Sequence, residues 1–176
     1  VKYDGLAAGK GVHICESVTD AKKSAEDLLK PGEKIIIEDF IKGIELSSIY
    51  ICNPNASKKT IGLTWIKDYK SRDEYNSGPN TGGMGAVTHP FCFHKKNDIY
   101  ALNTEIEKII IKTLVAINSG SADKSQYNGF LYLGLMISVN DNKPYLLEYN
   151  CRMGDPETQN LMIYLHKNNV DFLDLI

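Results

Sequence analysis

The sequence predicts a mixed α+β fold, and three observations support this prediction. Apolar side chains alternate with a period of two over residues 129–140, which is typical of a half-buried strand. Apolar side chains recur at spacings of three and four over residues 98–117, which is typical of a helix. Short turns join neighbouring strand candidates, so hairpins occur beside crossovers. This mixture favours α+β over a doubly wound parallel sheet.

The first third of the chain alternates between strand and helix signals. A strand is expected at 12–15, and a helix at 17–30 with Thr19 as its N-cap and Pro31-Gly32 as its end. Three isoleucines predict a strand within 34–40. Strands at 44–52 and 60–66 follow, joined by the turn at 53–55.

A polar, glycine-rich stretch covers residues 67–90, and such long connections are usually functional or disordered. The clearest helix follows at 98–117. A hairpin of strands at 129–140 and 143–150 leads to a last helix that starts at Pro156 and runs to about 166. The chain starts at Val1 as if inside a strand, and residues 171–176 read as the start of a further helix. We therefore expect a piece of a longer polypeptide.

Composition narrows the class of protein. The 176 residues are 43% hydrophobic and 24% charged, as in ordinary globular proteins, and the net charge of −2 gives no general attraction to nucleic acid or anionic membranes. No signal peptide or 18-residue apolar stretch is present. The widely spaced cysteines predict reduced thiols and a cytoplasmic location. Small molecules are therefore the expected partners.

Residues 78–85 are the most informative segment, because four of the eight are glycine. Glycine contributes no side chain to a core, so this segment offers bare backbone N–H groups that suit phosphate or carboxylate oxygens. A flexible loop is the alternative. A second glycine loop at 5–11 follows Lys2 and contains Lys10, but its spacing is not that of a P-loop. Polyphosphate binding and a solvated turn both remain open there.

Glu148 and Asn150 form the candidate metal site. Alternate residues of a strand share a face, so both should point the same way, with Leu146 before them. Their oxygen atoms, followed by Arg152, suit a magnesium ion that bridges phosphates. The alternative is an edge strand whose polar face meets water.

Residues 37–45 could hold a nucleotide base. Phe40 and Ile41 would cover its flat face, and Glu45 could accept hydrogen bonds from ribose hydroxyls. A plain connection between strands is the alternative. The scattered histidines read as structural, and Ser47 and Ser48 lack the elbow motif of a hydrolase.

Taken in order, these segments resemble the ATP-grasp superfamily, and within it the phosphoribosylamine–glycine ligase family. The resemblance covers essentially the whole chain. It is carried by residues 1–12, 37–45, Asp68 with Lys70, 78–86, 129–136 and 148–157. The segment 78–85 together with the run to Glu157 is the part specific to this ligase family.

The resemblance implies two lobes of mostly antiparallel sheet with helices, which hold a nucleotide between them. Residues 1–41 would be the remainder of the small ATP-binding lobe, and residues 42–176 the larger lobe with the substrate loop and the metal strand. The chain would be truncated at both ends, so the N-terminal and C-terminal domains of its parent would be absent. Other purine-biosynthesis domains could be fused to that parent.

The resemblance also implies roles for individual residues. Those expected to bind ATP are Lys2, Gly9, Lys10, Glu38, Asp39, Phe40, Ile41, Glu45 and Asn80. Those expected to bind substrate are Gly82, Gly83, Met84, Arg152 and Asp155. Arg152 and Asp155, with Lys70 and Asp68, would be catalytic. Glu148 and Asn150 would hold Mg²⁺, with Mn²⁺ as an alternative.

The implied reaction is an ATP-dependent ligation in purine biosynthesis. Glycine would be activated as glycyl phosphate and then joined to 5-phosphoribosylamine. One position departs from the family, because Ser71 stands where an ATP-contacting arginine is usual and Arg72 follows one residue late. Another ATP-grasp carboxylate–amine ligase, an ATP-binding fragment inactive without the missing domains, and a structural interaction module remain alternatives.

Overall fold

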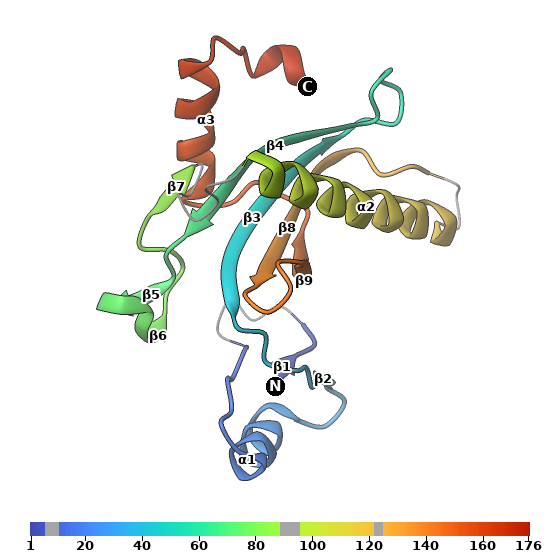
Figure 1. The fold of residues 1–176 in the computed structure, drawn as a ribbon. Coiled ribbons are helices and arrows are strands. Elements are labelled where there is room, and N and C mark those ends of the chain that lie inside the picture. The colour runs from blue at the N-terminus through green and yellow to red at the C-terminus, as the bar shows by residue number, and fades with distance from the viewer. Residues whose placement is uncertain (6–10, 89–95, 122–124) are drawn as a thin grey trace. The chain divides into compact units, whose positions relative to one another are not determined.

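A computed structural model describes residues 1–5, 11–88, 96–121 and 125–176 (Figure 1). The chain divides into two compact units. The first unit contains Val1–Ile41 and Lys70–Gly82, and the second contains Lys42–Tyr69 and Gly83–Ile176.

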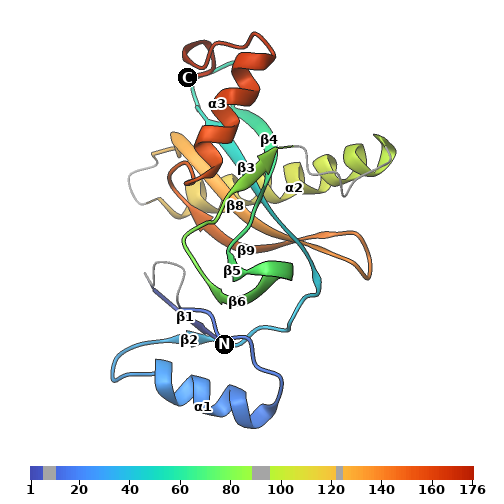
Figure 2. The same cartoon turned by 90° about the vertical axis from the view of Figure 1, so that its left-hand side faces the viewer.

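The first unit is built from very short elements. Strand β1 (Lys2–Tyr3) pairs antiparallel with β2 (Ile35–Ile36), and helix α1 (Val18–Leu28) lies near this pair (Figure 2). The strand predicted at 12–15 is reduced to one bridge between Val12 and Lys2. The two-residue β2 replaces the longer strand predicted within 34–40.

The N-cap of α1 is Ser17, so the prediction of Thr19 was wrong. The Ser17 hydroxyl accepts a hydrogen bond from the Asp20 backbone N–H at 3.1 Å while Ser17 itself keeps an extended backbone. A capping side chain must precede the first helical turn, and Thr19 already lies inside it.

Residues 67–88, the described part of the stretch 67–90, are more regular than a structureless connection. Strands β5 (Ser71–Asp73) and β6 (Ser77–Asn80) pair around the 3₁₀ turn η1 (Glu74–Asn76), and β7 (Ala86–Thr88) pairs with the sheet of the second unit. These strands form through backbone hydrogen bonds without apolar alternation, so no periodic signal predicted them.

The second unit is an antiparallel five-stranded sheet in the order β7-β4-β3-β8-β9. Its long strands are β3 (Gly43–Cys52), β4 (Thr60–Asp68), β8 (Gly129–Ser138) and β9 (Pro144–Asn150). The hairpins predicted from the two turns are confirmed, because β3 pairs with β4 and β8 pairs with β9. The central strand β3 also pairs with β8 along its full length.

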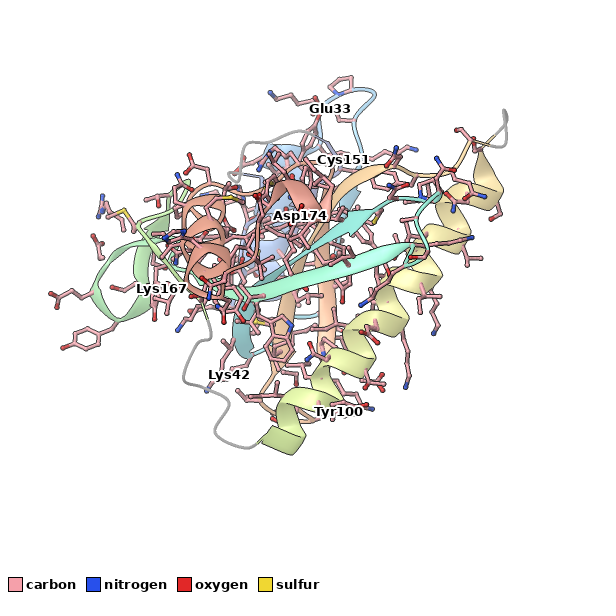
Figure 3. The ribbon with its side chains drawn as sticks, turned by 90° about the horizontal axis from the view of Figure 1, so that it is seen from above. Glu33, Lys42, Tyr100, Cys151, Lys167 and Asp174 are labelled. Carbon is pink, nitrogen blue, oxygen red and sulfur yellow. The ribbon has the colours of Figure 1, made fainter. Side chains whose placement is uncertain are left out.

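Two helices cover opposite faces of this sheet (Figure 3). Helix α2 (Lys96–Gly120) packs Leu102, Ile106 and Ile110 against the β8 leucines. Helix α3 (Glu157–Lys167) packs Leu161 and Leu165 against Ile66 of β4.

The helices predicted at 98–117 and at 156 to about 166 are confirmed as α2 and α3. The helix expected at 171–176 is only the 3₁₀ turn η2 (Leu173–Leu175). In the described part of the chain, no helix has the length and apolarity needed to cross a membrane.

Candidate functional site

The face of the sheet that carries α3 also carries the candidate metal ligands. In β9, Asn150 lies opposite Tyr132 and Glu148 lies opposite Gly134. Gly134 in turn lies opposite Ser47 of β3. Since cross-strand partners share a face, these polar side chains gather on one side of the sheet. Glu148 and Asn150 therefore point the same way, as the alternation predicts.

A β-bulge separates the candidate metal ligands from the core residue before them. Glu148 pairs with Gly134, but Leu146 pairs with the next residue, Leu135, so Leu147 is an extra residue in β9. Leu146 consequently packs against the core beneath α2. The expectation that Leu146 shares a face with Glu148 was wrong, because a bulge reverses the alternation.

Gly134 gives the Glu148 side chain room to lie across the sheet. A Cβ at position 134 would stand 3.0 Å from the Glu148 Cγ, which is tighter than ordinary van der Waals contact. On the opposite face, the Tyr149 hydroxyl lies 2.5 Å from the Thr113 Oγ1 of α2. The strand that carries the two candidate ligands is thus tied to α2 on one face and has room for Glu148 on the other.

The donor set of Glu148 and Asn150 fits Mg²⁺. The ion prefers oxygen ligands and usually takes few from protein, with water and phosphate oxygens completing its octahedron. Glu148 is exposed and so accessible to such partners. Within the described residues, no group of three or more His, Cys, Asp or Glu side chains could by itself hold a metal.

The segment after β9 carries the candidate substrate residues. Gln159 of α3 donates a hydrogen bond to the Asp155 Oδ1 at 2.8 Å, which orients that carboxylate. The guanidinium of Arg152 is exposed and donates to the Met153 carbonyl at 2.9 Å. The Thr158 backbone N–H donates to the Gly154 carbonyl at 3.1 Å, so the segment is tied to the first turn of α3.

Gly83, in the second half of the glycine segment 78–85, lies next to the residues that follow β9. Gly83 has a φ of +139°, and a Cβ there would lie 2.7 Å from the Pro156 Cδ and 3.3 Å from the Asp68 Oδ1. Only glycine can bring its backbone this close in such a conformation. The Met84 N–H donates to the Tyr69 carbonyl at 2.7 Å, and the Met84 side chain is exposed. The structure therefore brings Asp68, Gly83 and Asp155 together.

The candidate nucleotide residues lie mostly in the first unit. The Lys2 ammonium forms an ion pair with the Glu38 carboxylate at 2.8 Å. Asp39 and Phe40 are exposed, whereas Ile41 is half-buried. Gly9 and Lys10 lie outside the described residues.

Residues 70–82 contribute further candidates to this unit. The Lys70 carbonyl accepts hydrogen bonds from both the N–H and the hydroxyl of Thr81, at 2.7 and 2.9 Å. The backbone of Asn80 pairs with Ser71, and Gly82 is exposed. Arg72 forms an ion pair with Asp73 at 2.8 Å, and this contact raises the pKa of the guanidinium and lowers the pKa of the carboxyl.

Glu45, the candidate ribose ligand, belongs to the second unit. It is half-buried on β3, two residues before Ser47 and opposite Met136. The alternation of β3 therefore places it on the same face as Glu148 and Asn150.

Sequence reasoning missed one polar cluster on this face. Ser47, Tyr132 and Glu157 are buried and lie within hydrogen-bonding distance of one another. Ser47 and Tyr132 are 85 residues apart, so no local pattern joins them. The only available signal was an acidic residue directly after Pro156 at a helix start, where the helix dipole favours negative charge.

The amino-acid sequence is similar to one family of known proteins over nearly its whole length. Residues 1–158 match the phosphoribosylglycinamide synthetase, ATP-grasp (A) domain. The phosphoribosylamine–glycine ligase of Clostridium acetobutylicum is 40% identical over the whole of this chain, and that of Allochromatium vinosum is 38% identical over 97% of it.

A solved structure agrees with these sequence matches. The crystal structure of phosphoribosylamine–glycine ligase from Thermotoga maritima covers 92% of the chain with a TM-score of 0.69 and 38% identity. The fold is thus that of an ATP-grasp domain, which confirms the predicted fold class. The chain belongs to the phosphoribosylglycinamide synthetase family. It spans about 40% of the length of the first two relatives.

Proposed function

We propose that the chain is the ATP-grasp part of an ATP-dependent ligase that joins glycine to 5-phosphoribosylamine. The products would be glycinamide ribonucleotide, ADP and phosphate, in purine biosynthesis. The observation that carries this proposal is the match to ligases of that name over the whole chain. The gathering of Asp68, Gly83 and Asp155 beside the face with Glu148 and Asn150 supports it.

The proposed chemistry is carboxylate activation. A glycine carboxylate oxygen attacks the γ-phosphorus of ATP, ADP leaves, and glycyl phosphate forms. The amine of phosphoribosylamine then attacks the glycyl carbonyl, phosphate leaves and an amide results. A positioned site accelerates both steps mainly by orientation and charge neutralisation.

The residues of the chain divide these tasks. Arg152 and Asp155 would bind the two small substrates together with Gly82, Gly83 and Met84, while Asp68 and Lys70 assist. Glu148 and Asn150 would hold Mg²⁺ or Mn²⁺, which neutralises charge on the moving phosphoryl group. For the nucleotide we propose Lys2, Gly9, Lys10, Glu38, Asp39, Phe40, Ile41, Glu45 and Asn80.

The assignment of residues 1–41 to a small lobe and 42–176 to a larger lobe stays a prediction, as does a fusion to other purine-biosynthesis domains. A location in the cytoplasm, favoured by the widely spaced cysteines, belongs to the same proposal. No affinity for nucleic acid or membranes is expected.

The test is an assay of the full-length polypeptide that carries residues 1–176. ADP release should require both glycine and phosphoribosylamine. ADP formed equally well with another amino acid and another amine would replace the proposal by a different ATP-grasp ligase.

A second candidate is an ATP-binding fragment that is inactive alone, which the 40% coverage of the relatives favours. Isothermal titration of residues 1–176 with Mg-ATP tells a binding-competent part from an inert one. Binding without turnover would show that this part holds the nucleotide but needs the rest of the polypeptide for catalysis.

A further inference from the structure

A buried polar cluster joins the sheet to the start of α3. The Ser47 Oγ lies 2.6 Å from the Tyr132 hydroxyl, and each of these hydroxyls lies 2.9 Å from the Glu157 Oε1. The three residues are only 3–5% exposed. They come from β3, β8 and the first position of α3, so the cluster connects three separate elements.

The hydroxyl groups of this cluster supply fewer protons than the cluster has hydrogen-bonding contacts. Ser47 and Tyr132 carry one hydroxyl proton each, and these two protons serve three short contacts. Burial raises the pKa of the Tyr132 phenol, so this hydroxyl keeps its proton and remains a donor. The Glu157 carboxyl group is therefore held in one orientation by hydroxyl groups of two neighbouring strands.

Such an arrangement is a poor choice for stability alone. Burying a carboxylate costs several kcal/mol unless hydrogen bonds compensate, and apolar groups of similar volume often stabilise as well or better. A Cβ at Gly154 would also overlap the Glu157 carboxylate, so the preceding segment is shaped around this group. What the cluster does fix is the place where β3, β8 and the start of α3 meet.

The geometry that it specifies relates two parts of the candidate site. Tyr132 is the cross-strand partner of Asn150, and Ser47 is the partner of Gly134, which faces Glu148. Glu157 follows Asp155 by two residues and Arg152 by five. A shift of the α3 start relative to the sheet would therefore displace the substrate residues from the metal ligands.

We propose that Glu157 is a positioning residue, and that Ser47 and Tyr132 hold it so that Arg152 and Asp155 stand in register with Glu148 and Asn150. The kinetic part of this inference rests on the proposed ligase function. Its structural part does not, and the experiments separate the two.

The first experiment compares Tyr132→Phe with the matched control Tyr145→Phe in the full-length polypeptide. Tyr145 is on β9, and its exposed hydroxyl bonds to Asp141 at a turn. We expect Tyr132→Phe to lower kcat/KM for glycine about 10- to 100-fold, as small misplacements do, with the KM for ATP unchanged. Tyr145→Phe should match the wild type. Equal kinetics for both variants would overturn the proposal.

The second experiment compares Glu157→Gln with Glu157→Leu. Glutamine keeps a carbonyl oxygen that accepts from these hydroxyls but cannot carry a charge, whereas leucine removes the acceptor. A positioning role predicts substantial activity for Glu157→Gln and its loss for Glu157→Leu. Equal loss in both folded variants would show that the charge itself is needed, and the positioning role would be wrong.

The third experiment does not depend on activity. Amide hydrogen exchange in the full-length polypeptide should become about tenfold faster at residues 151–158 in Tyr132→Phe, because local opening becomes easier, and remain unchanged in α2. Unchanged exchange at 151–158 would overturn the inference. If the wild type shows no glycine-dependent ADP release, the proposed function fails, while the exchange result still decides the positioning role.

Discussion

The two units of the chain differ sharply in how they are packed. Every buried apolar side chain that the structure describes belongs to the second unit, where Ile49, Leu133 and Leu135 are fully buried. The first unit has a helix with no buried residue, and its Ile37 and Phe40 are 73% and 69% exposed. The order of an element depends largely on the apolar surface that it buries.

The candidate residues are divided between the two units along the same line. Glu148, Asn150 and Asp155 are carried by the packed unit, whereas Lys2 and Phe40 lie on the loosely packed one. We infer that a well-packed sheet sets the geometry of the candidate metal and substrate residues before any ligand binds. The candidate nucleotide residues of the first unit should gain order from the ligand itself. Four predictions test this comparison, from the largest expected effect to the smallest.

Glu148→Ala should abolish metal-dependent turnover while leaving the packed unit intact. Removal of one of two oxygen ligands is expected to lower the rate about 1,000-fold, because charge on the phosphoryl group is no longer neutralised. Rates of ADP release and circular dichroism measure the two effects. Wild-type turnover in this variant would contradict the metal assignment.

Leu133→Ala and Val18→Ala should differ in stability. Leu133 is fully buried, and its truncation should lower the free energy of unfolding by about 3 kcal/mol through lost burial and a cavity. Val18 is 73% exposed on α1, so its truncation should change stability by less than about 0.5 kcal/mol. Urea denaturation provides both values, and equal losses would erase the contrast between the units.

Stability should decline between pH 9 and pH 11 in part through Cys52 of the packed unit. Burial raises the pKa of this thiol from 9.0 to about 11, so the folded chain keeps a proton that the unfolded chain releases. Unfolding is therefore favoured as pH rises through this window, by about 2 kcal/mol in total.

Cys52→Ala should reduce this decline without abolishing it, because burial also raises the pKa values of Tyr50 and Tyr132, which contribute in the same direction. Unfolding free energies at pH 8, 9, 10 and 11 make the comparison. An identical slope in the wild type and Cys52→Ala would show that burial of this thiol has no such effect.

Phe40→Ala should weaken Mg-ATP binding without affecting stability. An exposed ring contributes little to a core, but stacking on a base would be lost, and the dissociation constant should rise about tenfold. Isothermal titration measures the affinity. A stability loss with unchanged affinity would instead make Phe40 a packing residue.

The sequence predicted the parts of the fold that periodicity determines. The alternation in β8 and the helical spacing in α2 identified these elements because each buries an apolar face. The short strands β5, β6 and β7 escaped prediction, since backbone pairing leaves no mark in the apolar pattern. Ser17 was missed as a cap because two hydroxyl residues, at 17 and 19, stood near the start of α1.

The features of the candidate site also differ in whether the sequence could predict them. The shared face of Glu148 and Asn150 followed from a local period of two. The meeting of Gly83 with Pro156, and of Ser47 with Glu157, depends on contacts between distant segments of the chain. Such contacts are fixed by tertiary packing, so only the structure could provide them.

The extra residue Leu147 has a consequence for how β9 can change. Because Leu147 has no partner on β8, Leu146 before it points toward the core, whereas Glu148 and Asn150 after it point toward the face of the candidate metal site. Deletion of Leu147 would make Leu146 and Glu148 neighbours in a regular strand, with Leu146 still toward the core and Glu148 still on the face of the candidate metal site. The strand would lose the local bend and the extra twist that a bulge provides. The bulge therefore sets the direction in which the two candidate ligands leave the sheet, whereas the alternation sets the face on which they lie.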